Sequence, residues 1–442
     1  MGMLKTVAQA WKVPEIRSKM IFTLLMLVVF RIGSNIPVPN INRSVLAEMF
    51  TGETGLFDLF DLFSGGSFSN FTIFALSITP YITASIIVQL LTIAFPYFEN
   101  LAKEGMEGRK KMAQITRYMT VVLALIQAIG LTVGLFRQAV VDKSAFSVIV
   151  VILVLTAGTA FLMWLGEQIN DRGIGNGISL LIFGGIVARI PSGVRSISTL
   201  YGDGGISLVT IILFVIAAVL VTAGVVLIQE GQRRIPVQYS KKMAGRKMVG
   251  GQSSNIPLKV NTAGVIPVIF ASSLLSLPIV ISQFAGIQPQ SGKGATLWQK
   301  ILKICSQSDW CNFRNFGEFK YTLGLVVYIV LVIFFAYFYT SITFNPLEVS
   351  SNLKKAGGFI PGIRPGKPTT DYLSKVLNNI IFIGAIGLTI IAVVPIFFSG
   401  AFGANVGFGG TSLIIVVGVV LETIKQIESQ MLVRNYKGFL ND

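Results

Sequence analysis

Residues 71–95 read FTIFALSITPYITASIIVQLLTIAF, and this stretch decides the fold class. It carries no charged residue, and a helix needs about 20 mostly apolar residues to cross the hydrocarbon core of a bilayer. Pro80 lacks a backbone N–H, so it predicts a bend or a division of the helix. Ile82 and Ile86 are one helical turn apart and share a face. The stretch therefore predicts a membrane-spanning helix that is interrupted near Pro80.

The rest of the chain repeats this apolar pattern. Its mean hydropathy is +0.72 and only 13% of its 442 residues are charged, against about 25% in soluble domains. We expect an all-α polytopic membrane protein, because continuous apolar runs exclude the alternating strands of a barrel. The fifth run is short and needs its glycine-rich flank, GIGNG, to span. The ten predicted transmembrane helices cover residues 20–38, 71–95, 115–136, 148–166, 177–190, 206–228, 263–284, 323–343, 378–399 and 409–427.

Basic residues are distributed unevenly between the two sides of such a protein. With ten spans both termini lie on one side, and that side carries more than twice as many Lys and Arg residues as the other. The positive-inside rule then places both termini in the cytoplasm. Topology and anionic lipids account for some of this charge. Seven basic residues in the single loop 230–259 favour a docking site for an acidic or anionic partner.

Several kinds of chemistry are missing from the chain. It has no histidine, and it lacks the HExxH, GxSxG and P-loop motifs. Glu167, Glu230 and Glu422 lie at or near the ends of predicted spans, where a carboxylate reaches water. Ionisable groups within a membrane normally mark proton or ion coupling. The sequence therefore predicts no enzyme, no cofactor and no metal site.

The two cysteines leave two interpretations open. Cys305 and Cys311 both lie in the loop 286–322, on the predicted extracytoplasmic side. Their six-residue spacing permits a disulfide in an oxidising compartment. Two incidental thiols explain the same residues equally well.

Two loops on the predicted cytoplasmic side are unusual. The loop 230–259 joins a β-like run, RRIPVQYS, to a basic turn and a second polar stretch, which predicts a protruding hairpin. The loop 344–375 contains GGFIPGIRPGKP, which is rich in turn formers and has Arg364 at its tip. A ribosome or a motor protein would use these charges, and phosphate or lipid binding is the alternative.

A short amphipathic segment separates the first two spans. Residues 55–70 read GLFDLFDLFSGGSFSN, which could form two helical turns and then break at Gly65 and Gly66. A surface amphipathic helix is the simplest interpretation. Polar residues also occur inside several spans, where they either bond neighbouring helices or line a seam that can part.

Five longer motifs carry a family resemblance. The segments EGQRRIPVQY, NTAGVIPVIFASS, FNPLEVSSNLKKAGGFIPGIRPGKPT, FLMWLGEQINDRGIGNGISLLIF and GGTSLIIVVGV resemble the bacterial SecY family, the central subunits of the protein-translocation channel. The resemblance runs from about Pro14 to Val433, while the loop 286–322 and the short C-terminal tail match the family poorly. It implies two five-helix halves in an inverted repeat around an hourglass pore. The implied divisions are a cytoplasmic N-terminal segment of residues 1–19, halves of residues 20–192 and 193–428, and a cytoplasmic C-terminal tail of residues 429–442.

The resemblance also implies a function: a channel that passes unfolded polypeptides and releases hydrophobic segments sideways into the cytoplasmic membrane. Particular residues have an implied role in this channel. The pore ring is Ile82, Ile86, Ile182, Ile186, Ile269 and Ile415. The plug, a weakly held stopper hinged at its glycines with its aspartates facing water, includes Phe57, Asp58, Phe60, Asp61, Phe63, Gly65 and Gly66. The lateral gate is lined by Gln89, Thr92, Gln127, Asn261, Ser272 and Ser273. Partners dock at Arg233, Arg234, Lys241, Lys242, Arg246, Lys247, Arg364 and Lys367.

The implied partners are the SecE and SecG subunits, the SecA ATPase or a ribosome, signal sequences, translocating polypeptides and membrane lipids. Two other classes of function compete with this interpretation. A secondary transporter would share ten spans and broken helices but should carry coupling sites at mid-membrane. A lipid-embedded enzyme is disfavoured by the missing histidine and catalytic pairs.

Overall fold

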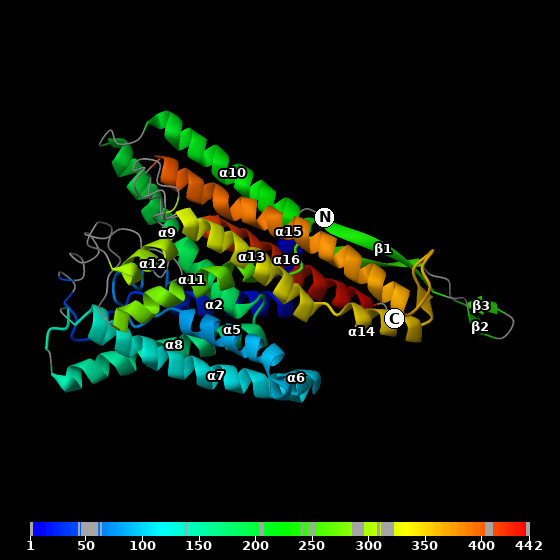
Figure 1. Ribbon diagram of the computed structural model, residues 1–442, viewed down its shortest axis with the longest axis horizontal. Coiled ribbons are helices and arrows are strands. Elements are labelled where there is room, and N and C mark those ends of the chain that lie inside the picture. The colour runs from blue at the N-terminus through cyan, green and yellow to red at the C-terminus, as the bar shows by residue number, and fades with distance from the viewer. Residues whose placement is uncertain are drawn as a thin grey trace.

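The computed structural model describes residues 3–42, 45, 61, 64–137, 139–142, 144–202, 207–239, 242–244, 247–249, 253–284, 296–306, 310, 322–402 and 410–438. Long helices lie side by side along one axis, and a thin β-hairpin protrudes from one end of the bundle (Figure 1). We call this the hairpin end and the opposite end the distal end. The helices α6 (Pro96–Lys103) and α14 (Pro346–Lys355) lie towards the hairpin end, and α12 (Leu297–Cys305) lies at the distal end.

Each of the ten predicted spans overlaps one helix. Among the described residues, six helices are long and apolar enough to cross a membrane on that ground alone, or seven if the bent pair α5 and α6 is one span. This is consistent with the predicted polytopic helical protein. The ten helices are α2 (Pro14–Gly33), α5 (Thr79–Ala94), α7 (Met106–Ile129) with its π-helical continuation η1 (Gly130–Leu135), α8 (Ala145–Arg172), α9 (Gly177–Gly202), α10 (Leu208–Glu230), α11 (Ile266–Phe284), α13 (Leu323–Thr343), α15 (Lys367–Phe402) and α16 (Gly410–Gly438).

The interruption predicted at Pro80 takes a different form. Helix α5 begins at Thr79, so Pro80 lies in its first turn, where a missing N–H removes no intrahelical bond. Residues 71–78 form successive turns, with positive φ at Phe71 and Ser77. The sharp bend of 100° comes later, between α5 and α6, where Phe95 is extended before Pro96. The prediction of one long span over residues 71–95 was therefore wrong.

The fifth span is longer than predicted. Helix α9 continues through Pro191 to Gly202, so it does not need residues before Gly177 to cross a membrane. Gly173 and Gly175 instead form the connection from α8, and Gly175 has a φ of +94°, which favours glycine.

A small sheet joins the two loops singled out in the sequence. Strand β1 (Gln232–Tyr239) pairs antiparallel with β4 (Ser253–Lys259), in a register from Gln232 opposite Lys259 to Gln238 opposite Ser253. The predicted hairpin is confirmed, and β2 (Lys242–Ala244) pairs with β3 (Lys247–Val249) towards its tip. Strand β5 (Gly358–Phe359) pairs with the other edge of β1. The sequence did not predict this link, and the sheet lies outside the all-α bundle.

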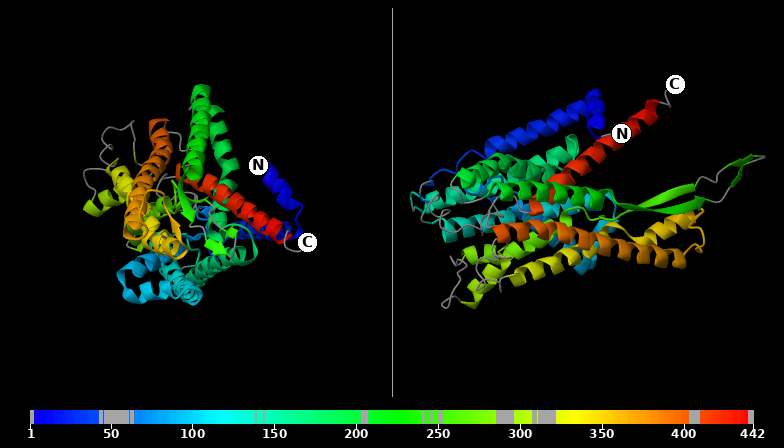
Figure 2. Two further views of the ribbon diagram at one scale, coloured as in Figure 1. Left: turned by 90° about the vertical axis from the view of Figure 1, so that its right-hand side faces the viewer. Right: turned by 90° about the horizontal axis from the view of Figure 1, so that it is seen from above.

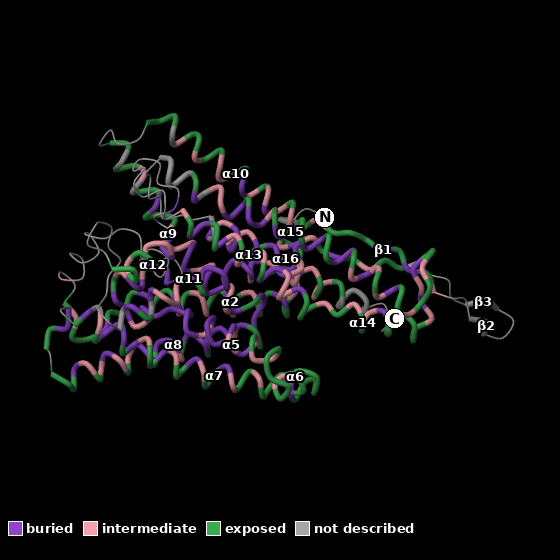
Figure 3. The backbone as a smooth tube through the Cα atoms, viewed as in Figure 1, coloured by how far each residue is buried: buried purple, intermediate pink, exposed green. Residues whose placement is uncertain are grey.

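Burial follows the long axis of the bundle (Figure 3). The largest hydrophobic cluster combines side chains from most of the long helices. A second cluster packs Phe68 and Phe71 against Phe136, and so ties the turns before α5 to the segment after α7. Many apolar side chains on the outer faces are exposed, for example Val219 and Leu220 on α10. Such a surface suits contact with lipid.

The two ends of the described chain lie together. Helix α1 (Met3–Trp11) packs against α2 and α16 (Figure 2). The Thr6 hydroxyl donates to Glu428 Oε1 at 3.3 Å, and Ala10, Ile16 and Ile427 are buried together.

Candidate functional site

Six isoleucines occupy the middle of the bundle. Ile82 and Ile86 come from α5, Ile182 and Ile186 from α9, Ile269 from α11 and Ile415 from α16. All six belong to one hydrophobic cluster, and none is more than 7% exposed. Isoleucine is β-branched and therefore stiff at χ1. The six residues that the family resemblance grouped as a pore ring thus all lie in one buried cluster, to which four helices contribute them.

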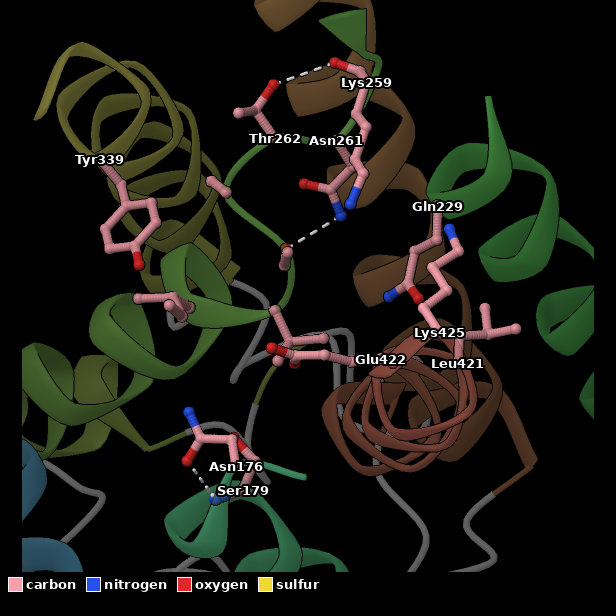
Figure 4. A pocket seen from close by; sticks show the side chains of 15 residues that line it. Asn176, Ser179, Gln229, Lys259, Asn261, Thr262, Tyr339, Leu421, Glu422 and Lys425 are labelled. Atoms are coloured by element: carbon pink, nitrogen blue, oxygen red, sulfur yellow. Dashed lines mark hydrogen bonds between the residues drawn. The ribbon is translucent and has the colours of Figure 1, made fainter. Parts of the chain in front are cut away.

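A cavity of about 300 Å³ with polar side chains in its lining lies on the hairpin side of these isoleucines, none of which lines it (Figure 4). Ser179 precedes Ile182 by three residues on α9, and Ile266 precedes Ile269 by three on α11. Gly418 follows Ile415 by three on α16, which runs in the opposite direction. The cavity therefore lies one helical turn from the isoleucines on three helices at once.

Polar and charged side chains line this cavity. Asn261 Nδ2 donates to the Gly264 carbonyl at 2.9 Å, and Lys425 Nζ lies 2.7 Å from Glu230 Oε1. The exposed Glu422 side chain faces the interior in Figure 4. Glu230 and Glu422 are both exposed, as their predicted access to water requires. Glu167, away from the cavity, is less exposed and lies 2.6 Å from Arg117 Nε.

A turn of the segment before α5 contacts α9 beside Ile186. Gly185 precedes Ile186 on α9, and Gly65 lies against it: a Cβ on Gly65 would come within 2.7 Å of Gly185 Cα. Gly65 and Gly66 have φ values of +66° and +89°, which glycine adopts without strain. These glycines therefore form a tight turn packed on α9.

Asp61 does not face water as the resemblance implied. It is 5% exposed, and its Oδ2 lies 3.2 Å from Arg189 Nη2 on α9. Its Oδ1 accepts from the Ser69 N–H at 3.0 Å and from the Ser64 hydroxyl at 3.3 Å. A carboxylate is buried where a cation and hydrogen-bond donors replace its water. The expectation that Asp61 faces water was therefore wrong; Phe57, Asp58, Phe60 and Phe63 lie outside the described residues.

Five of the six polar residues assigned to the lateral gate lie on packed helices. Helix α5 packs against α7 and α11. Gln89 Nε2 donates to Ser85 Oγ at 3.3 Å, and the Thr92 hydroxyl donates to the Val88 carbonyl at 2.9 Å. Gln127 on α7 and Ser273 on α11 are half-buried, and Ser272 is buried. Asn261 lies apart from this group, in the cavity.

The basic residues assigned to docking gather at the hairpin end. Arg233 and Arg234 are exposed on β1, and Arg364 and Lys367 are exposed beyond β5. Because β5 pairs with β1, the sheet joins the two loops that carry these basic residues. Lys242 and Lys247 belong to β2 and β3, and Lys241 and Arg246 lie outside the described residues.

The loop 286–322 contains a free thiol. Cys305, at the end of α12, is buried, and burial raises the pKa of its thiol. Its structural neighbour Trp310 is also buried and donates from Nε1 to the Ile304 carbonyl at 2.8 Å. Cys311 lies outside the described residues.

Comparison with known proteins identifies the family. The SecY family model matches residues 72–424. The protein translocase subunit SecY of Streptomyces galbus is 48% identical over 99% of this chain and 100% of its own length, and that of Halalkalibacterium halodurans is 47% identical over the same shares. The chain belongs to the SecY family. This membership agrees with the resemblance that its motifs carry.

Solved structures show that the fold is that of the SecY channels. A protein-conducting channel superposes with a TM-score of 0.66 at 19% identity, covering 96% of this chain and 97% of its own. A SecY structure whose plug domain stabilises the closed state of the translocation channel gives 0.65 at 20% identity, with the same coverage. Sec61 in a canine ribosome–channel complex gives 0.64 at 19%, again with the same coverage. The SecY family consists of membrane channels, so this member is not an enzyme.

Proposed function

We propose that this SecY-family chain is the subunit through which unfolded polypeptides cross the cytoplasmic membrane. The observation that carries the proposal is the isoleucine cluster of α5, α9, α11 and α16, which lies between a polar cavity and a closed turn. We infer that the translocation path runs along the bundle axis from the cavity through these side chains. The hairpin end then faces the cytoplasm, which agrees with the basic residues gathered there.

The isoleucines suit a waist that accepts any sequence. A translocated chain offers no constant pattern of hydrogen-bonding groups, so a polar ring could not match it. A short apolar constriction resists wetting when it is empty, and it can close a pore without a tight seal of specific contacts. The stiff side chains of Ile86, Ile186 and the other ring members hold a defined aperture.

Lateral release requires a seam that can part. We place it between α5 and α7 on one side and α11 and α13 on the other. Gln89, Thr92, Gln127, Ser272 and Ser273 belong to this region. The hydrogen bonds of Gln89 and Thr92 stay within α5, so they need not break when the seam parts. A signal sequence has an apolar h-region of about 7–15 residues, which gains about 0.8 kcal/mol per buried CH₂ when it enters lipid.

The driving force must come from a partner, because the sequence has no P-loop motif. We assign docking to the sheet at the hairpin end, where Arg233, Arg234 and Arg364 are exposed. Acidic or anionic partners are attracted there by charge. The SecA ATPase and the ribosome are the candidate partners, and SecE and SecG are the expected companion subunits.

Segment 55–70 is the proposed plug. Its described residues pack against α9 directly below the isoleucines. Deleting residues 57–68 should leave a channel that translocates but leaks ions, because the waist and the docking sheet remain. Loss of translocation without leak would count against this role.

Reconstitution tests the function directly. We would incorporate the chain with its companion subunits into vesicles, add the SecA ATPase, ATP and an unfolded secretory protein, and measure the fraction protected from external protease. The proposal expects protection that depends on both ATP and this chain. Protection of the same size in vesicles without the chain would contradict it.

A further inference from the structure

The turn of residues 64–69, on the distal side of the isoleucines, is bound to α9 through an ion pair between Asp61 and Arg189. Arg189 follows Ile186 by three residues, so it lies one helical turn beyond the isoleucine cluster on the same helix. Its Nη2 is 3.2 Å from Asp61 Oδ2, and only 8% of the Asp61 side chain and 23% of the Arg189 side chain are exposed. The charges therefore meet in a largely water-free place, where each needs the other.

Several other polar groups of the turn are hydrogen-bonded as well, although the buried Ser67 hydroxyl has no partner among the described residues. Asp61 Oδ1 accepts from the Ser69 N–H and the Ser64 hydroxyl, and the Ser64 oxygen accepts from the Phe68 N–H at 3.0 Å. Asp61 thus organises the turn over residues 64–69 at the same time as it binds Arg189. In Asp61→Asn the ion pair with Arg189 would be lost. The amide oxygen of the asparagine could still accept the hydrogen bond from the Ser69 N–H.

A second arginine holds the same turn from another helix. Arg31, in the last turn of α2, donates from Nη1 to the Gly65 carbonyl at 3.1 Å. Gly65 itself rests on Gly185 of α9. The turn is therefore held by α2 and α9 together, at the distal side of the isoleucines.

We propose that the Asp61–Arg189 pair is a latch that keeps this turn under the closed pore and must separate each time a polypeptide passes. This inference rests on the proposed channel function. It names a positioning residue, Arg189, which holds the turn in place and does not itself belong to the waist.

An ion pair suits a contact that has to open and close. When the turn moves away from α9, both charged groups regain water, and their hydration offsets the lost attraction. An apolar contact of the same size would gain nothing from water on opening. The pair also specifies one position of the turn, because the carboxylate and the guanidinium must meet in a defined geometry.

Ion leak from vesicles in the absence of substrate tests the latch. We expect Arg189→Gln and Asp61→Asn each to raise the leak about tenfold, because breaking a largely buried pair leaves one charge uncompensated. Both variants should translocate a normal secretory protein at least as fast as the unchanged chain, and should also pass one with a shortened h-region. Arg189→Lys keeps the charge and should leak little. The matched control is Arg195→Gln, which makes the same charge change at an exposed position of α9.

The double variant separates a latch from two independent effects. Because Asp61 and Arg189 act on each other, Asp61→Asn combined with Arg189→Gln should leak no more than either single variant. A leak of Arg189→Gln equal to that of Arg195→Gln would overturn the latch, and so would lost translocation without leak. If the unchanged chain fails to translocate, the proposed function itself is wrong, whatever the leak.

Discussion

The two sides of the isoleucine cluster differ in one respect that decides how a pore could work. On the hairpin side, Ser179, Ile266 and Gly418 border a polar cavity of about 300 Å³. At the level of Ile186 on the same helix α9, Gly185 touches Gly65, and one turn further towards the distal end Arg189 binds Asp61. One side borders a cavity and the other carries a turn bound to α9. For the proposed channel, this difference implies that a polypeptide arrives from the hairpin side and displaces the distal turn.

The largest expected effect concerns the partner that delivers a polypeptide to the cavity on the hairpin side. Reversing the charge of Arg364 should reduce SecA-driven translocation by about thirtyfold or more, since an arginine hot spot contributes about 2 kcal/mol or more to an interface. Arg364 is exposed, so folding and membrane insertion of Arg364→Glu should be normal. Translocation into vesicles is the measurement.

Lys355→Glu provides the control, because Lys355 is also exposed and lies in the same loop, at the end of α14. Normal translocation by Arg364→Glu would remove this residue from the docking site. An equal loss in both variants would mean that general charge, and not this position, attracts the partner.

The next effect concerns the isoleucine cluster, which separates the cavity from the distal turn. Ile86 is 6% exposed and Ile415 is 1% exposed. An asparagine at either position should raise the resting ion leak about tenfold, because burying an unpaired amide costs about 1–3 kcal/mol in proteins and water relieves that cost. Conductance recordings equal to those of the unchanged chain would exclude these residues from the waist. A polar substitution at the lipid-facing Val219 is the matched control.

A smaller effect is expected at the core of the docking sheet. Ile235 on β1 is buried with Leu258 and Leu353, so Ile235→Ala should destabilise the sheet by about 2–5 kcal/mol. The hairpin should be cut faster by protease, and translocation should fall less than in Arg364→Glu. The exposed Arg233 on the same strand offers the control Arg233→Ala for cleavage. If cleavage rises equally in both variants, the cluster of Ile235, Leu258 and Leu353 does not hold the loops 230–259 and 344–375 together.

The sequence predicted what depends on local pattern. Continuous apolar runs predicted helices that overlap all ten long helices, and the β-like run before a basic turn predicted the hairpin. The start of α5 at Thr79 was missed because residues 71–78 are as apolar as the helix and differ only in backbone conformation. The strand β5 is two residues long, too short to give an alternating pattern.

Asp61 shows why the site was harder to predict than the fold. A carboxylate in an amphipathic segment normally faces water, and the sequence offers no local sign that Asp61 does otherwise. Its partner Arg189 lies on another helix, far along the chain, and only the folded structure brings the two together. The isoleucines were likewise found through family motifs, because isoleucine in a membrane span carries no signal of its own.

Crosslinking of a stalled polypeptide tests the central claim most directly. Cysteines would be placed singly at Ile82, at Ile182 and, as a control, at the exposed Ile212 of α10. Cys311 would be replaced by serine, while the buried Cys305, whose thiol pKa is raised by burial, reacts slowly. We predict crosslinks from a chain halted in transit to Ile82→Cys and Ile182→Cys but not to Ile212→Cys. Crosslinks to Ile212→Cys without any to the two ring positions would contradict a path through the isoleucines.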